Sequence, residues 1–280
     1  MTREVSGMKK AMKKLPHNLL LIIVSFIFIF PFIWMVLCSF KSESEVMNPK
    51  TIFPAVWLFE NYARAMSAAP FDMFFKNSFI EAIVAVVAQL ITSALAGFAF
   101  AKLQFKSKKF LFMIFLATMM IPSEATFITN YLTVSHLKLL NTTAAVVLPG
   151  LISVFGIFLL RQNFITVPDA LLESARIDGA GDFRIFISIC LPIVKGALAT
   201  IAIISFIGSW NSYLWPMIVT NKLNMKNVQT GMHYLMGTED AGKSWNVIMA
   251  GAVVMVLPVT VLFVSMQRYY VQGIAKVGIK

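Results

Sequence analysis

The segment GTEDAGKS, residues 237–244, matches the pattern of a phosphate-binding loop: Gly, four residues of any type, Gly, Lys and Ser. In a working ATP site such a loop follows a buried strand and opens a helix whose backbone amides point at the phosphates. Here MHYLM precedes the loop, the apolar run WNVIMAG follows it, and Glu239 and Asp240 within it would repel a polyphosphate. We interpret the segment as a glycine-punctuated turn, so any ATP must be bound by another chain.

The rest of the sequence shows no residue types at the spacing of a catalytic or metal site. His17, His136 and His233 are isolated, and Cys38 and Cys190 stand far apart without a C-x-x-C spacing. The G-x-S-x-G and H-E-x-x-H patterns do not occur either. We therefore expect no catalytic residue, no metal and no cofactor in this chain.

Long uncharged runs are the main feature of the 280-residue chain. Its residues are 58% hydrophobic and 13% charged, whereas an ordinary soluble domain carries about 25% charged residues. A helix needs roughly 20 residues to cross a bilayer. The candidate runs are Asn18–Phe40, Asn77–Ala101, Phe110–Thr129, Ala144–Leu160, Ile193–Tyr213 and Val247–Met266. The composition predicts an all-α integral membrane protein with six transmembrane helices.

The basic residues predict the orientation of these helices. The first run is longer than the apolar part of a secretory signal, about 7–15 residues, and no small-x-small cleavage site follows it. Of the 24 Lys and Arg residues, 16 fall on the side of both termini and 8 on the other side. The positive-inside tendency then places both termini in the cytoplasm. The net charge of +11 fits this topology and contact with anionic lipid; without a basic stripe among exposed aromatic residues, we expect no nucleic-acid partner.

The loop 161–192, which reads RQNFITVPDALLESARIDGAGDFRIFISICLP, is the longest one on the side expected to be cytoplasmic. Thr166, with Asp169 three residues later, favours a helix start, and strong helix formers continue to residue 177. Gly179 and Gly181 then stop the helix. The segment predicts a short helix followed by a glycine corner.

A second helix is expected to follow the corner and to lead into the fifth apolar run. Asp182 can cap its start. Four apolar residues recur at helical spacing, which predicts that they share one face: Phe183, Phe186, Ile187 and Cys190. A polar loop between two spans needs no such organisation, so we expect a partner to press on it.

Six residues in this loop form the pattern E-x-A-x3-G-x9-I-x-L-P: Glu173, Ala175, Gly179, Ile189, Leu191 and Pro192. The pattern resembles the signature loop of permease subunits of ABC-type importers. Ser174 replaces the Ala that is usual after the Glu, and it is also small. The resemblance implies that the loop forms a coupling helix that docks on an ATPase subunit. The coupling residues would be Glu173, Ser174, Ala175, Asp178, Gly179, Ile189, Leu191 and Pro192.

The resemblance extends over nearly the whole chain, through the segments NSFIEAIVAVVAQLITSALAGFAFAKLQFKSKK, SWNSYLWPMIVTN and QRYYVQGIAKVGIK. The chain looks like a maltose-permease-type subunit of a carbohydrate importer. This implies a type I ABC importer permease fold in one domain, with tails 1–17 and 267–280 around a core 18–266. It also implies an ATPase dimer, a second permease and an external substrate-binding protein as partners, in a bacterial inner membrane. The cargo would be a sugar, an oligosaccharide or a sugar-like polyol phosphate.

Aromatic and polar side chains gather near the outer end of the fifth run, at Trp210, Asn211 and Tyr213. They fit either an aromatic belt at the membrane interface or a wall of the substrate path, where rings stack on sugar C–H groups and Asn211 bonds hydroxyls. Glu124 is an acid within the third run and a further candidate for the path. Glu81 is a second acid in an apolar run, and the residues around it suggest no role.

The second run carries Ser93, Gly97 and Ala101 at intervals of four residues, which favours close packing against another helix in lipid. Two other classes of membrane protein are alternatives. An ion-coupled secondary carrier usually shows internal repeats and paired ionisable groups near mid-membrane, and neither is evident here. A membrane-embedded enzyme would need a nucleophile–base or metal constellation, which the sequence lacks.

Overall fold

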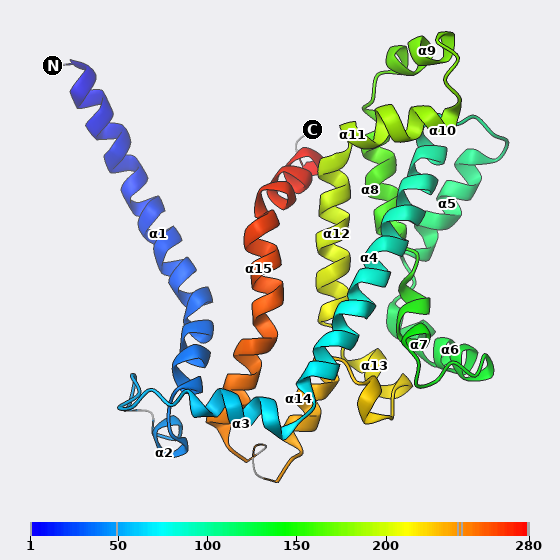
Figure 1. Cartoon of the computed structure of the whole chain (residues 1–280). Helices are drawn as coiled ribbons and strands as arrows, with labels where there is room; N and C mark the ends of the chain where they lie inside the picture. The colour runs from blue at the N-terminus through cyan, green and yellow to red at the C-terminus, as the bar shows by residue number, and fades with distance from the viewer. Residues whose placement is uncertain (1, 49, 240, 242, 279–280) are drawn as a thin grey trace. The chain divides into compact units, whose positions relative to one another are not determined.

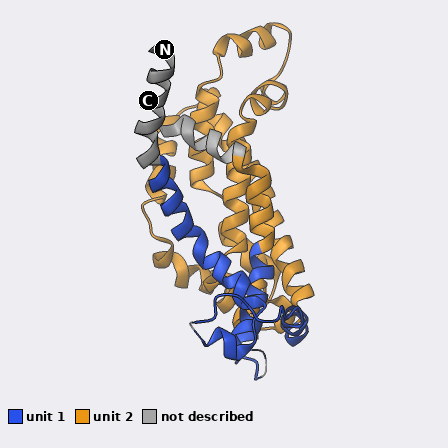
Figure 2. Ribbon diagram, turned by 90° about the vertical axis from the view of Figure 1, so that its left-hand side faces the viewer, with its two compact units in different colours: residues 1–69, 234–256 blue, residues 70–233, 257–280 orange. Residues whose placement is uncertain are grey.

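The computed structural model describes the backbone of residues 2–48, 50–239, 241 and 243–278, and the side chains of the same residues within 18–267. Within these residues the chain forms helices and turns and no strand, which confirms the all-α prediction. Figure 1 shows the helices in chain order. Two compact units are present (Figure 2), one of residues 1–69 and 234–256, the other of residues 70–233 and 257–280.

The first unit contains three helices, α1 (Thr2–Ser39), α2 (Glu43–Val46) and α3 (Glu60–Ala68). The second contains α4 (Phe71–Lys102), α5 (Lys108–Thr118), α6 (Ser123–His136), α7 (Thr143–Val147), η1 (Leu148–Gly150), α8 (Val154–Ile165), α9 (Asp169–Ile177), α10 (Asp182–Ile185), η2 (Phe186–Cys190), α11 (Leu191–Ile193), α12 (Lys195–Trp210), α13 (Leu214–Val219) and η3 (Leu223–Met225). Both units share α14 (Val228–Met236) and α15 (Trp245–Gly278). The segments expected as terminal tails are thus helical in their described parts.

Three single helices are long and apolar enough to cross a membrane: Asn18–Ser39 of α1, the whole of α4, and Trp245–Gln267 of α15. Three bent helix pairs bring the number to six if each pair is one span. Each of the six overlaps one of the predicted runs, although the first half of the fifth, Asp182–Ile193, belongs to the predicted hairpin. The prediction of a single helix over Phe110–Thr129 is wrong, because α5 and α6 meet at 95°. Pro122 explains the break, since a proline pushes the residue before it out of the helical region.

The fourth predicted run is also bent, and the fifth begins at a corner. The segment α7–η1 meets α8 at 46°, and Ser153 starts α8 anew by accepting a hydrogen bond from the Gly156 amide at 3.0 Å. The segment α10–α11 meets α12 at 79°, with a non-helical Val194 directly after the short helix that holds Pro192. Hydropathy alone locates these spans, and their corners follow from proline and cap positions.

A buried polar cluster holds the first unit together. Lys41 is fully buried; its Nζ donates to the Thr51 carbonyl at 2.6 Å and lies 4.2 Å from the centroid of the Trp34 ring. Asn61 Nδ2 and Asn246 Nδ2 both donate to the Lys41 carbonyl, at 2.9 and 3.1 Å. These bonds join the end of α1 to α3 and to the start of α15, which satisfies polar groups that water cannot reach.

The centre of the second unit is α4, which packs against α8 and α12. Gly97 allows this close approach, because a Cβ there would lie 2.9 Å from Leu160 Cβ and 3.1 Å from the Arg161 amide nitrogen. Ser93, one turn away, faces Gly156 of α8, where a Cβ would collide with the Ser93 hydroxyl. The prediction of close packing along Ser93, Gly97 and Ala101 is confirmed at these two contacts.

Candidate functional site

The segment between α8 and α12 forms a helical hairpin, as the sequence predicts, but its first helix starts later than expected. Thr166 ends α8, where its Oγ1 donates to the Asn163 carbonyl at 2.8 Å, and α9 begins at Asp169 after an extended Pro168. The predicted start at Thr166 is therefore wrong. Pro168 imposes the later boundary, because a proline disfavours the helical conformation for the residue before it, here Val167.

Gly179 closes α9 with a left-handed residue at φ +82°. Its amide donates to the Arg176 carbonyl at 3.0 Å, and the Ala180 amide donates to the Ala175 carbonyl at 2.9 Å. This pair of bonds is the Schellman motif, which uses the left-handed residue to satisfy the last carbonyls of a helix. The prediction that Gly179 stops the helix is confirmed, and its left-handed angle is one that a Cβ would penalise.

The second helix of the hairpin differs from the prediction in its cap and in the residues that share one face. Asp182 is the first residue of α10 rather than its cap, and its Oδ1 accepts a bond from Arg176 Nη2 at 2.9 Å. Phe183 and Ile187 are 67% and 46% exposed. The buried stripe is Ile185, Phe186, Ile189 and Cys190. It lies within or beside the π-helical turn η2, where the α-helical spacing assumed by the prediction no longer holds.

The residues predicted to couple divide into two groups. Ala175, Ile189 and Leu191 pack against a buried cluster that contains Phe164, Leu172 and Cys190. Glu173, Ser174, Asp178, Gly179 and Pro192 are exposed. A cavity of about 210 Å³ lies inside the hairpin, lined by Ala175, Asp178, Ala180, Arg184, Ile185, Ser188 and Ile189. Three apolar residues of the pattern thus hold the hairpin on the helices, and the other five remain accessible.

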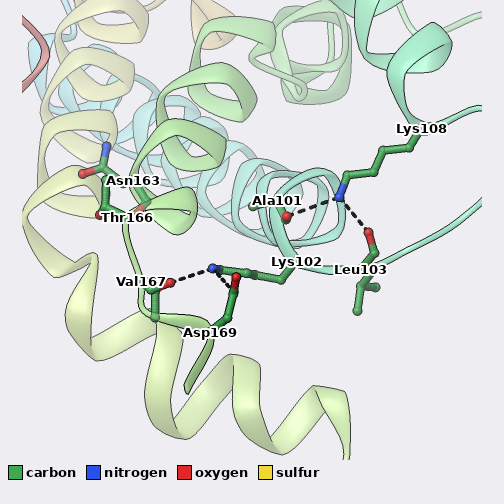
Figure 3. Close-up of polar contacts among 8 residues, drawn as sticks. All are labelled: Ala101, Lys102, Leu103, Lys108, Asn163, Thr166, Val167 and Asp169. Carbon is green, nitrogen blue, oxygen red and sulfur yellow. Dashed lines mark hydrogen bonds and ion pairs between the residues drawn. The ribbon is translucent and has the colours of Figure 1, made fainter. Parts of the chain in front are cut away.

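An ion pair fixes the beginning of α9. Lys102 Nζ donates to Asp169 Oδ1 and to the Val167 carbonyl, each at 2.6 Å (Figure 3). The bond and the positive charge of Lys102 lower the pKa of the Asp169 carboxyl below its ordinary value. Asp169 therefore stays ionised well below neutral pH, and the ion pair is present throughout the physiological range.

Near the other end of α12, a cavity of about 610 Å³ collects three of the predicted path residues, Glu124, Asn211 and Tyr213. Its remaining lining residues are Ser123, Phe127, Ser212, Leu214 and Trp215. Phe127 and Trp215 form an edge-to-face pair with centroids 5.6 Å apart. A cavity of this size with aromatic walls and a few polar groups has the character of a small-molecule site.

Trp210 lies elsewhere, in the helix core. It is 1% exposed and packs against three rings, Phe75, Phe79 and Phe206, with centroids 6.0, 4.9 and 5.6 Å away. Neither the interface belt nor the path wall expected from the sequence describes this position. The neighbouring phenylalanines belong to α4 and to an earlier turn of α12, so the burial depends on tertiary packing that local sequence does not reveal.

Polar side chains that the sequence prediction missed line an adjoining cavity of about 280 Å³, which shares Ser212 and Trp215 with the larger one. Gln89 crosses between helices there: its Nε2 donates to the Gly150 carbonyl at 2.6 Å and its Oε1 accepts from Ser205 Oγ at 2.5 Å. The available signal was a polar amide in the middle of an apolar span, which usually marks a helix contact or a wet cavity.

Glu81 is 2% exposed, and its carboxyl group has a hydrogen-bond partner. Its Oε2 accepts a bond from Asn227 Nδ2 at 3.3 Å, and the same nitrogen donates to the Ser212 carbonyl at 3.1 Å. Ser78 Oγ, one turn earlier on α4, accepts from the Val228 amide at 2.8 Å. Glu81 therefore helps to hold the loop before α14 on α4, beside the cavity.

The phosphate-loop pattern at 237–244 follows the helix α14 rather than a buried strand. Asp240 and Gly242 of the pattern lie outside the described residues. A helix in this place cannot aim the loop at phosphates as a strand does, which agrees with the interpretation as a turn. Among the described residues, no group of three or more His, Cys, Asp or Glu side chains could hold a metal ion.

A comparison with models of protein families shows to which family the chain belongs. The model of binding-protein-dependent transport system inner membrane components matches residues 93–276. The chain belongs to this family.

Relatives of this inner membrane component match it over nearly their whole length. The sn-glycerol-3-phosphate transport system permease protein UgpE of Rhizobium meliloti is 33% identical over 96% of this chain and 98% of its own. The arabinooligosaccharides transport system permease protein AraQ of Halalkalibacterium halodurans is 33% identical over 92% and 93%. A chain from the crystal structure of a bacterial ABC transporter involved in alginate import shares the fold, with TM-score 0.84, 24% identity and 94% and 98% coverage.

As an inner membrane component of this family, the chain is a multi-pass permease subunit and not an enzyme. It has the ABC importer permease fold. It works with a separate ATPase, a second permease subunit and a substrate-binding protein. Membership decides against the ion-coupled carrier and the membrane enzyme.

Proposed function

We propose that the chain forms half of the translocation path of an importer for a sugar, an oligosaccharide or a sugar-like polyol phosphate. Its single permease domain would place both termini and the hairpin 166–192 on the cytoplasmic side. The relatives are named for sn-glycerol-3-phosphate and arabinooligosaccharides, and the related solved complex for alginate. These cargoes share hydroxyl-rich groups, and this common chemistry supports the proposed class.

The exposed apolar surface of the hairpin is the observation that carries the coupling role. Ile177 is 87% exposed, Phe183 67% and Leu171 47%. Large apolar side chains gathered on one polar hairpin mark a contact surface. Glu173 and Asp178, also exposed, add negative charge beside them and favour a basic partner surface. The ATPase is the partner that this surface fits.

The cavity beside α12 is the proposed part of the path. Asn211 and Ser212 can bond cargo hydroxyls, and Tyr213 and Trp215 can stack on the C–H faces of sugar rings. Glu124 can accept hydrogen bonds from hydroxyl groups at the same cavity. We assign no contact with cargo to Trp210, because its side chain is buried among phenylalanines.

ATP-driven closure of the ATPase pair would displace the hairpin and rock the helices from an inward-facing to an outward-facing packing. Such a change is a rigid-body switch between two states, whose populations the nucleotide shifts through its different affinity for each. The chain performs no bond chemistry in this cycle. Its part is to transmit the displacement and to line the path.

Purification of the tagged chain from its own membranes tests this function. We expect an ATPase to co-purify in stoichiometric amount, and the external binding protein of the same system to bind a sugar or polyol phosphate in a ligand screen. With that cargo, Asn211→Ala should weaken ATP-dependent uptake. The control is Trp210→Phe, which keeps an aromatic ring in the helix core and should leave uptake unchanged. A chain that purifies without an ATPase and transports along an ion gradient would contradict the proposal.

A further inference from the structure

The last residue of α4 reaches directly into the start of the hairpin. Lys102 Nζ donates to the Val167 carbonyl and to Asp169 Oδ1, each at 2.6 Å, so one side chain binds both the linker after α8 and the first turn of α9 (Figure 3). Only 6% of the Lys102 side chain is exposed, whereas Asp169 is 76% exposed. The ammonium thus lies beneath the hairpin, where its partners must come from the protein.

Apolar packing at the same place brings α4 and the start of the hairpin into contact, and Lys102 adds the polar bonds. Leu172 of α9, Val167 of the linker and Phe98 of α4 belong to a single buried cluster. Next to Phe98, Gly97 packs closely against Leu160, and this close packing resists movement of α4 along α8. A displacement of α9 must therefore move the end of α4, provided that Lys102 holds the first turn.

The opposite end of α4 binds the loop beside the cavity. Asn77 Nδ2 donates to the carbonyls of Asn224 and Lys226 at 2.9 and 2.8 Å. Glu81 accepts from Asn227, which in turn bonds the carbonyl of the cavity residue Ser212. The 32 residues of α4 span about 48 Å at 1.5 Å per residue. A single helix thus joins the hairpin at one end to the cavity rim at the other.

We propose that Lys102 is a positioning residue for coupling: it fixes the first turn of the hairpin to α4, so that movement of the hairpin reaches the cavity through this helix. The inference rests on the proposed function, because it needs an ATPase that moves the hairpin. Lys102 touches neither nucleotide nor cargo. Its role is mechanical, since the two bonds at its ammonium define the connection between α9 and α4.

Four chains test this role: the wild type, Lys102→Met, Lys102→Arg and Lys108→Met. Methionine keeps most of the length and apolar contact of lysine but removes the charge. Arginine keeps the charge and the donors. Lys108 is the matched control, because its Nζ also bonds carbonyls at the end of α4, those of Ala101 and Leu103 at 3.2 and 2.8 Å, without touching the hairpin (Figure 3).

The readout is the accessibility of the cavity in the assembled complex. Each chain carries Asn211→Cys in a background without Cys38 and Cys190, and the rate of modification by N-ethylmaleimide is measured with and without ATP plus vanadate. We expect trapping to change the rate in the wild type, Lys102→Arg and Lys108→Met. In Lys102→Met the change should shrink at least about fivefold, the scale of a lost coupling, while the ATPase still co-purifies.

An unchanged response in Lys102→Met, or an equal loss in Lys108→Met, would overturn the inference while the proposed function stands. A wild-type chain that retains no ATPase would overturn the proposed function itself. If Lys102→Met fails to reach the membrane, Asp169→Ala serves in its place, since it alters an exposed side chain and removes one of the two bonds. A partial loss of the response is then expected, and a full response would count against the role of Lys102.

Discussion

Replacement of Gly179 by alanine is expected to weaken the corner between α9 and α10 by a conformational penalty alone. The residue has φ +82°, and a Cβ built there meets no atom within 4 Å. Steric collision therefore adds nothing to the cost. A residue with a Cβ in the left-handed region costs about 1–2 kcal/mol, so the corner should open roughly 5- to 30-fold more often.

Hydrogen–deuterium exchange of a peptide that covers residues 170–185 measures this opening. The amides of Gly179 and Ala180 close the Schellman motif, and their exchange should accelerate by the stated factor in Gly179→Ala. Gly179→Asn should show a smaller effect, because asparagine tolerates the left-handed region. Gly181→Ser is the matched control: Gly181 has φ −70° and also has no atom within 4 Å of an added Cβ.

The functional counterpart is Gly179→Leu, which adds a bulky side chain to the surface proposed to dock. It should leave the protein in the membrane and abolish ATP-dependent uptake. Equal exchange rates in Gly179→Ala and Gly181→Ser would refute the assignment of strain to this corner. Normal uptake by Gly179→Leu would refute the importance of the corner for coupling.

Three further predictions concern the helices around the hairpin and the cavity. Gly97→Ala should lower the free energy of unfolding by about 1–3 kcal/mol through overpacking against Leu160, whereas Gly196→Ala, where a Cβ meets no atom within 4 Å, should not; thermal unfolding in detergent compares them. The lowered pKa of Asp169 means that its ion pair contributes fully above the ordinary carboxyl pKa and is lost only as pH falls through the lower native value. A spin label at Ser174→Cys should keep one mobility from pH 8 to 5, and a rise in mobility between pH 7 and 5 would contradict this. Glu81→Ala should cost about 1–3 kcal/mol by leaving Asn227 Nδ2 without one acceptor, and Glu81→Gln, which keeps a carbonyl oxygen, should cost less; equal melting temperatures would refute the role of that bond.

The sequence was sufficient for the features that depend on local composition. Apolar runs located all the candidate spans, because burial in lipid requires long uncharged helices. The end of α9 at Gly179 could be predicted, because a glycine after a run of helix formers commonly adopts the left-handed conformation that ends a helix. The small residues at Ser93 and Gly97 likewise indicated a close helix contact.

The features that depend on distant contacts were not accessible from the sequence. In the sequence, Lys102 is one of many basic residues at the end of a span. Its partner Asp169 lies 67 residues away, so the ion pair could not be predicted from local sequence. The burial of Trp210 could not be predicted, because the rings that bury it come partly from another helix. Hydropathy depends on residue type and carries no information on the direction of a helix. It therefore could not predict the 95° corner between α5 and α6.

The side of the membrane on which the hairpin lies is the central claim, and labelling of intact cells with a membrane-impermeant thiol reagent tests it most directly. Single-cysteine chains would carry Ser174→Cys or Glu239→Cys, both at exposed positions, without Cys38 and Cys190. The account predicts that position 239 reacts in intact cells and position 174 only after the membrane is permeabilised. Reaction of position 174 from outside, with position 239 protected, would contradict it.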